Sequence, residues 1–181
     1  MKKTLLIISF LSFFALTGKA QEKKQDTKSL PAQYQEMMTK ILGHFPKAAT
    51  STATQMLDFA KSMIGVPYRY ATSNPDKGFD CSGFVNYVFS SFGFKVPRSS
   101  PEFASAGVPV KLADAKVGDV LIFTGTNPRV RRIGHVGIIY SIEGDEIKFI
   151  HSTSGKANGV TVTEFNDYYK SRFMKAVSIV E

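Results

Sequence analysis

Cysteine is almost absent from this sequence, because Cys81 is the only one among 181 residues. A single cysteine cannot form a disulfide within the chain or supply a cysteine-rich zinc site. Long apolar runs are missing too, since the longest has about 13 residues and a membrane span needs about 20. Hydrophobic residues make up 43% and charged residues 21%, which excludes collagen and disorder throughout. The length fits one domain with some residues to spare.

The N-terminal segment, residues 1–20, has the pattern of a secretory signal peptide. Lys2 and Lys3 form a charged start, residues 4–16 an apolar core, and residues 17–20 a small-residue end. The alternative is an uncleaved anchor helix. No cysteine lies near the expected cleavage point, so we expect no lipid anchor and no stable membrane anchor. We expect an exported protein, periplasmic or secreted, that is not a lipoprotein.

The rest of the chain divides into a leader and a domain. Residues 21–53 begin polar and predict a flexible leader, in which the apolar spacing of residues 34–45 favours a short helix. His44 lies there without chemical neighbours. Without the three lysines of the signal segment, 20 basic and 15 acidic residues leave a net charge of +5. We expect no nucleic-acid partner, and we expect the compact domain over residues 54–181.

The domain changes character along its length. Apolar stripes predict helices over residues 55–64 and 81–92. A further helical turn or two is expected over residues 164–170. Short β-rich runs follow the second helix and predict strands at residues 120–123, 135–141, 147–152, 159–163 and 176–180. Helices followed by an antiparallel meander indicate an α+β fold.

The role of Cys81 has two interpretations. A lone cysteine is most often a small buried apolar residue. In an exported protein, however, an unpaired thiol is a liability unless it is shielded or used. Cys81 stands at the expected start of a helix, with Asp80 in the capping position, and the positive end of a helix favours a thiolate. The position therefore suits a nucleophile without proving one.

A thiol nucleophile needs a proton acceptor, and two histidines could provide it. His135 opens one expected strand, and His151 ends the next one, after a turn at residues 143–145. Antiparallel neighbours would bring both histidines to the same edge of the sheet, within hydrogen-bond reach. The alternative is that both are ordinary strand-end histidines with satisfied hydrogen bonds.

Five blocks of the sequence resemble the NlpC/P60 cell-wall peptidases in order and spacing, over roughly residues 55–180. The blocks are Phe79-Asp80-Cys81-Ser82-Gly83-Phe84-Val85, Pro97-Arg98-Ser99-Ser100, Val117-Gly118-Asp119-Val120-Leu121-Ile122-Phe123, Gly134-His135-Val136-Gly137-Ile138 and Phe149-Ile150-His151-Ser152. The resemblance implies a papain-like core with N-terminal helices on a central antiparallel sheet of about five or six strands. It also implies an exported endopeptidase that cuts peptidoglycan stem peptides, commonly between D-γ-glutamyl and a diamino acid.

The same resemblance implies a role for each residue of a catalytic site. Cys81 would attack the carbonyl carbon and form a thioester. His135 would act as base and then acid, and His151 would orient its imidazole. The oxyanion would lie near the Cys81 amide, with Tyr68 as a second donor. The alternative for Tyr68 is a packing aromatic.

Substrate contacts follow from the flanks of these blocks. In relatives that need a free stem-peptide amine, residues that match Asp80, Ser82 and Ser100 receive it. Asp80 and Ser82 could instead serve only to cap the helix, and both uses could hold at once. The pair Pro97-Arg98 could be purely structural.

The sequence departs from the family pattern in two places. Many relatives carry two glycines where Ala71 and Thr72 stand here, so the loop above the cleft could differ. Residues 124–133 form a basic loop that could be a solvated loop or could meet carboxylates of the stem peptide or the anionic wall. Its three arginines are Arg129, Arg131 and Arg132.

Other functions remain open beside the endopeptidase. One is a catalytically silent wall-binding module with the same fold. Another is an amidase or acyltransferase with the same thioester chemistry. Zinc hydrolysis through Cys81, His135 and His151 is disfavoured, because separations of 54 and 16 residues match no compact ligand motif. We therefore expect no cofactor and no metal.

Overall fold

The computed structural model describes residues 51–180, so the expected signal peptide and leader helix lie outside the described residues. Two helices come first, with a small hairpin between them. They are α2 (Thr52–Ser62), β1 (Ser73–Asn74), β2 (Gly78–Phe79) and α3 (Cys81–Ser91). Two 3₁₀ helices follow, Ser100–Ser105 and Leu112–Asp114, on either side of β3 (Val108–Val110). The remaining elements are β4 (Val120–Thr124), β5 (Ile133–Glu143), β6 (Glu146–Thr153), β7 (Gly159–Glu164), α4 (Asp167–Arg172) and β8 (Phe173–Ser178).

The main sheet has six antiparallel strands in the order β3-β8-β4-β5-β6-β7. The α+β fold and the expected antiparallel sheet are therefore confirmed. The β5–β6 hairpin turns at Gly144, whose φ of 60° suits glycine. Strand β3 escaped prediction because Pro109 interrupts it. A proline is tolerated there because β3 is an edge strand, paired only with β8.

The last helix and strand differ from their expected bounds. Helix α4 begins after Asn166, whose side chain caps it by accepting a hydrogen bond from the Tyr169 amide. It therefore covers residues 167–172 rather than 164–170. Strand β8 then starts at Phe173 and ends at Ser178, so the expected strand at residues 176–180 lies too late in the chain.

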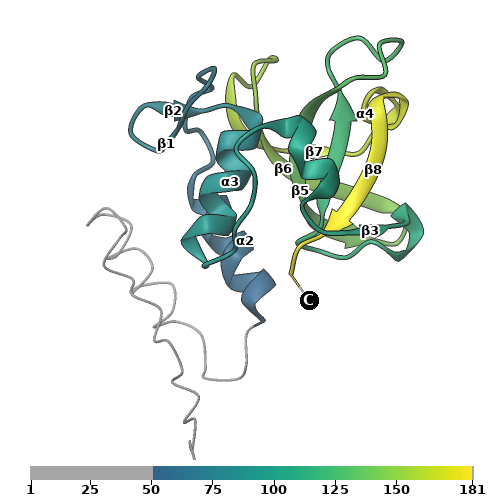
Figure 1. Cartoon of the computed structure of the whole chain (residues 1–181), viewed down its shortest axis with the longest axis horizontal. Coiled ribbons are helices and arrows are strands. Elements are labelled where there is room, and N and C mark those ends of the chain that lie inside the picture. The colour runs from purple at the N-terminus through teal and green to yellow at the C-terminus, as the bar shows by residue number, and fades with distance from the viewer. Residues whose placement is uncertain (1–50, 181) are drawn as a thin grey trace, which may run out of the picture.

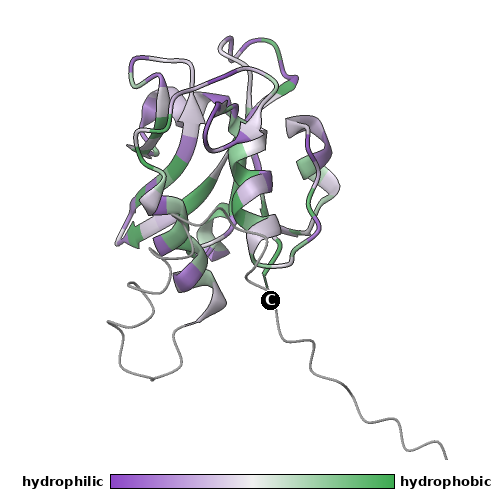
Figure 2. Ribbon diagram, turned by 90° about the vertical axis from the view of Figure 1, so that its left-hand side faces the viewer, coloured by the Kyte–Doolittle hydropathy of each residue, from purple (hydrophilic) through white to green (hydrophobic). Residues whose placement is uncertain are grey.

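Helices cover the sheet on both faces, and two cores result. Helices α2 and α3 lie together on one side of the sheet in Figure 1, and α4 lies near β8 on the other side. In Figure 2 much of the apolar colour lies on the strands of the main sheet. The core under α3 includes Phe84, Val88, Ile122, Val136, Ile138 and Ile150. The core on the other face includes Leu121, Phe123, Ile139, Phe149, Phe165 and Tyr169.

The start of α3 is fixed against the sheet by the segment before it. The buried Ser152 hydroxyl of β6 donates a 2.7 Å hydrogen bond to the Phe79 carbonyl. A Cβ at Gly83 would lie 2.1 Å from the Thr72 carbonyl oxygen, so only glycine permits this close approach. The first turn of α3 is thus clamped between the sheet and the loop at Thr72. None of the described helices is long and apolar enough to cross a membrane.

Candidate active site

Cys81 is the first residue of α3, and only 9% of it is exposed. The Asp80 side chain caps the helix by accepting a 2.6 Å hydrogen bond from the Gly83 amide. The thiol sulfur lies 4.0 Å from the Gly134 carbonyl oxygen, at the start of β5. Thus the helix start delivers the thiol to the strand end that carries His135, as the sequence suggested.

The two strand histidines form a buried pair. His135 Nε2 lies 2.8 Å from His151 Nδ1, and their rings are nearly perpendicular. His135 is 8% exposed and His151 is fully buried. Strand alternation places both on the α4 face of the sheet, where Phe149 and Tyr169 pack against the His151 ring. The expected meeting of the two histidines is confirmed.

Thr163 completes this chain of side chains, and sequence reasoning missed it. Its hydroxyl lies 2.9 Å from His151 Nε2. In the β6–β7 register His151 is opposite Thr161, so Thr163 is its diagonal neighbour on the same face. Because His135 uses Nε2 toward His151, its Nδ1 is the nitrogen left for Cys81.

Burial sets the protonation states of Cys81 and His135. It raises the pKa of the Cys81 thiol, and the Asp80 charge adds to that shift. The backbone amides of Val136, Ser82 and Cys81 itself act in the opposite direction. Burial, His151 and the Arg172 charge hold the pKa of His135 well below 6.5. Both groups are therefore neutral at pH 7, and attack requires a proton transfer from sulfur to imidazole.

Tyr68 lies beside Cys81 and lines both halves of the cleft described below. Its amide donates a 3.0 Å hydrogen bond to the Asn158 carbonyl, and it forms a bridge with Phe79. Burial, with the nearby Cys81 and Asp80, raises the pKa of its phenol. A phenol that stays protonated is a hydrogen-bond donor, as an oxyanion site requires.

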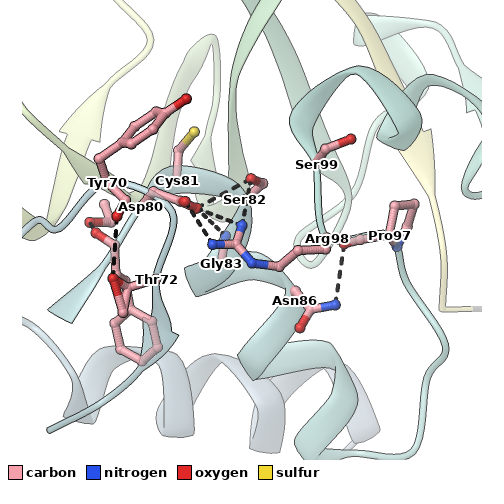
Figure 3. Close-up of polar contacts among 12 residues, drawn as sticks. Tyr70, Thr72, Asp80, Cys81, Ser82, Gly83, Asn86, Pro97, Arg98 and Ser99 are labelled. Atoms are coloured by element: carbon pink, nitrogen blue, oxygen red, sulfur yellow. Dashed lines mark hydrogen bonds and ion pairs between the residues drawn. The ribbon is translucent and has the colours of Figure 1, made fainter. Parts of the chain in front are cut away.

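Arg98 joins the residues that flank the thiol (Figure 3). Its guanidinium bonds both carboxylate oxygens of Asp80, at 2.9 and 2.7 Å, and the Ser82 hydroxyl at 3.2 Å. This contact is the second use of Asp80 beside its cap. Ser100 lies at the same end of the cleft. The structure thus gathers the three predicted substrate residues and adds Arg98, which the sequence left open as a structural residue.

The cleft has two halves that meet at Cys81. The larger, about 840 Å³, includes His135, Thr163, Arg172 and the loop at Lys156. The smaller, about 450 Å³, is lined by Tyr70, Asp80, Ser82, Arg98 and Ser99 to Pro101. Cys81, Tyr68 and Gly134 line both halves. A substrate laid across the thiol would have one part in each.

All three arginines of the basic loop at residues 124–133 are exposed, as the solvated-loop alternative predicts. None of its three arginines lines either half of the cleft. Arg131 donates hydrogen bonds to the carbonyls of Ser171 and Phe173, which attach the loop to α4 and β8. Arg172, which the sequence did not single out, lines the larger half instead. No group of three or more metal-ligating side chains occurs within residues 51–180.

Proteins from two bacteria match about three fifths of this chain. A probable endopeptidase of Corynebacterium glutamicum is 36% identical over 107 residues, 59% of this chain and 47% of that protein. The gamma-DL-glutamyl hydrolase of Bacillus subtilis is 38% identical over 115 residues, 62% of this chain and 26% of that protein. The chain therefore spans less than half the length of these curated relatives.

Solved structures share the fold. A crystal structure of an NlpC/P60 family protein from Bacillus cereus has a TM-score of 0.63 and 26% identity, covering 73% of this chain and 41% of that one. RipD of Mycobacterium tuberculosis, described as a non-catalytic NlpC/p60 domain protein, has a TM-score of 0.54 and 19% identity, covering 72% and 100%. The model of the NlpC/P60 family matches residues 65–178, so this chain belongs to the NlpC/P60 family.

Proposed function

We propose that this protein is an exported peptidoglycan endopeptidase that cuts stem peptides at the bond between D-γ-glutamyl and a diamino acid. One observation carries the proposal. A buried thiol at a helix start shares a cavity with a histidine that is bonded at 2.8 Å to a second histidine. The names of relatives support the reaction class, because they include endopeptidases and a gamma-DL-glutamyl hydrolase.

The reaction proceeds by acyl transfer to sulfur. His135 Nδ1 accepts the thiol proton while Cys81 Sγ bonds to the carbonyl carbon and the carbonyl electrons move to oxygen. When the C–N bond breaks, His135 returns that proton to the leaving amine and a thioester remains. Water then attacks the thioester, His135 takes its proton, and the acid product leaves as the thiol re-forms.

Two donors stabilise the oxyanion of this reaction. The Cys81 amide is at the open N-terminus of α3, and the Tyr68 phenol remains protonated because burial raises its pKa. One such donor is worth about 3 kcal/mol in the transition state. His151 stabilises the charged imidazole of His135 through their shared hydrogen bond.

The smaller half of the cleft suits the acyl side of the substrate. Asp80, Ser82 and Ser100 would receive the free amine of a stem peptide there. The Asp80 carboxylate already accepts hydrogen bonds from the Gly83 amide and the Arg98 guanidinium. The amine would therefore share this carboxylate with Arg98.

The second candidate is a silent wall-binding module, and RipD is the observation that favours it. RipD is described as a non-catalytic NlpC/p60 domain protein with a peptidoglycan-binding function, so this fold does not guarantee an enzyme. The intact Cys81, His135 and His151 support catalysis here. An amidase or acyltransferase with the same thioester would differ only in the bond cut or in the acceptor.

Digestion of purified peptidoglycan separates these candidates. The wild type and Cys81→Ala are incubated with the wall, circular dichroism confirms that both fold, and mass spectrometry identifies the released ends. We expect wild-type fragments that end in D-γ-glutamate and start with a diamino acid, and none from Cys81→Ala. Wall binding without fragments would favour the silent module, and other new ends would identify another bond.

Inhibitors distinguish thiol catalysis from zinc hydrolysis. Iodoacetamide should abolish fragment release because it alkylates Cys81, the sole cysteine. A chelator should leave the rate unchanged. Loss of activity with the chelator alone would contradict the thiol mechanism.

Export is part of the proposal, and residues 1–20 are its basis. The apolar core with two N-terminal lysines would direct secretion, with cleavage before Gln21. Expression with the native N-terminus and mass measurement of the exported protein test this directly. A cell-retained protein with residues 1–20 intact would contradict it.

A further inference from the structure

The position of His135 tells which half of the cleft holds the leaving part of the substrate. The imidazole must protonate the leaving nitrogen, so it lies on the leaving side of the scissile bond. His135 lines the larger half and not the smaller one. If Cys81 attacks a stem peptide, as proposed above, the diamino acid therefore enters the larger half.

The larger half is positively charged. Its lining includes Arg172 and Lys156 and no acidic side chain. The smaller half differs, because there Arg98 is paired with Asp80 at 2.7 Å. The two halves therefore differ in charge. The larger half, on the leaving side, is lined by cations and by no carboxylate, whereas the smaller half has one of each.

Arg172 is a buried cation at the wall of this larger half. Only 5% of it is exposed. Its Nε and Nη2 donate to the carbonyls of Gly125 and Thr124, at 2.9 and 3.0 Å, and the guanidinium lies over the Tyr168 and Tyr169 rings. No carboxylate within residues 51–180 forms an ion pair with it.

A buried charge without a counterion is costly, and its retention calls for a partner. The carbonyls of Gly125 and Thr124 fix the guanidinium in place, but they carry no full negative charge. The Arg172 charge also acts on His135 and His151, whose pKa values it lowers, so the cation is close to the reacting groups. A substrate anion in this half would lie within the same field.

We propose that the leaving side of the cleft is a carboxylate subsite, in which Arg172 and Lys156 bind a free carboxylate on the diamino acid that departs. The inference rests on the proposed endopeptidase function. Lys156 lies in the exposed loop between β6 and β7, whereas Arg172 is buried. One cation is fixed, and the other can adjust to the substrate.

This subsite defines a substrate class. A diamino acid whose carboxyl group is free satisfies the two cations, whereas an amidated carboxyl group does not. The enzyme would therefore prefer short stem fragments that end at the diamino acid, or stems in which a carboxylate of that residue is unmodified.

Two synthetic tripeptides test the subsite on the mature protein. They are L-alanyl-γ-D-glutamyl-L-lysine and its C-terminal amide, which differ only in the leaving-side carboxylate. The measured quantity is the ratio of kcat/KM for the acid to that for the amide. We expect a ratio of about 10 or more in the wild type, the size of one charge-assisted hydrogen bond.

Three variants test which residues cause the preference for the acid over the amide. Arg172→Gln and Lys156→Gln should each move the ratio toward 1. Lys95→Gln, an exposed lysine outside both halves, should leave it unchanged. If Arg172→Gln fails to fold, Lys156→Gln carries the test, because the loop lysine is exposed. Arg172→Lys keeps the charge and should retain the wild-type preference.

The outcomes distinguish the carboxylate subsite from the endopeptidase activity on which it rests. Equal cleavage of both peptides by the wild type would overturn the subsite and leave the endopeptidase standing. A wild-type preference that persists in Lys156→Gln, or in a folded Arg172→Gln, would overturn the assignment to that residue. Cleavage of neither peptide would overturn the proposed function, and the subsite with it.

Discussion

The tautomer of His135 depends on a hydroxyl two hydrogen bonds away, on Thr163. If His151 donates from Nε2 to this hydroxyl, its Nδ1 accepts from His135 Nε2–H. His135 Nδ1 then has a free lone pair for the Cys81 proton. The opposite assignment would place a proton on His135 Nδ1, where it cannot act as a base. Thr163 is therefore a positioning residue, which acts through His151.

Replacement of Thr163 tests this assignment. Thr163→Val keeps the shape of the side chain and removes the hydroxyl, so we expect kcat to fall about tenfold, the worth of one hydrogen bond of about 1.4 kcal/mol. KM for a stem peptide should change little. Steady-state kinetics with the tripeptide measure both quantities.

Thr163→Ser is the matched control, because it restores the hydroxyl and removes a methyl group. Its kcat should return to near the wild-type value. Equal losses in the valine and serine variants would show that Thr163 only packs, and would argue against a role for its hydroxyl.

Sequence reasoning reached some residues of the site and not others, for physical reasons. Cys81, His135 and His151 could be predicted because a helix start and a tight hairpin bring them together by local rules. Thr163 contacts His151 only through the register of β6 and β7, which the sequence leaves open. Arg172 follows 91 residues after Cys81, and only tertiary packing shows that it lines the same cavity.

Among the elements, the β5–β6 hairpin does most to build the site. Its turn at Gly144 makes the two strands antiparallel, so His135 and His151 meet at the same end. Gly137 lets them lie close, because a Cβ there would be 2.6 Å from Phe149 Cδ2 and 3.0 Å from His151 Cβ. The hairpin was predictable from its turn, but the need for glycine at position 137 appears only in the packed sheet.

The loop before α3 carries strain at Ala71. Its φ of 58° lies in the left-handed region, which favours glycine. The backbone at Ala71 thus has a conformation that glycine adopts more readily than alanine. Ala71→Gly should raise the free energy of unfolding by up to about 1 kcal/mol, because relief of strain exceeds the added chain entropy. Urea denaturation measures the change.

Ala115→Gly provides a control of opposite sign. Ala115 has a φ of −68°, which alanine adopts without strain. Glycine there should lower the free energy of unfolding by about 0.5–1 kcal/mol through chain entropy, and further through loss of the methyl group that packs against the second core. A destabilising Ala71→Gly of similar size would show that Ala71 is not strained.

The buried histidines make the folded protein less stable in acid. Burial, aided by the Arg172 charge, lowers the pKa of His151 from 6.5 to about 3. The unfolded chain therefore binds a proton below pH 6.5 that the folded protein takes up only near pH 3. The free energy of unfolding should fall as pH drops through this window, by about 2 kcal/mol between pH 7 and pH 5 from His151 alone.

Urea denaturation at pH 7, 6 and 5 measures this loss, and His151→Asn is the comparison. Asparagine does not titrate, so the variant should lose less stability across the same range. The burial of His135, whose pKa is also lowered, contributes a loss of the same sign in both proteins. Identical pH slopes in the two proteins would contradict the neutral, buried state of His151.

Cleavage of a stem peptide by the Cys81 thiol can be measured directly with the tripeptide. The wild type and Cys81→Ala are incubated side by side with L-alanyl-γ-D-glutamyl-L-lysine at pH 7, and release of free lysine is followed. The thiol mechanism predicts steady release by the wild type and none above background by Cys81→Ala. Release by Cys81→Ala at the wild-type rate would contradict it.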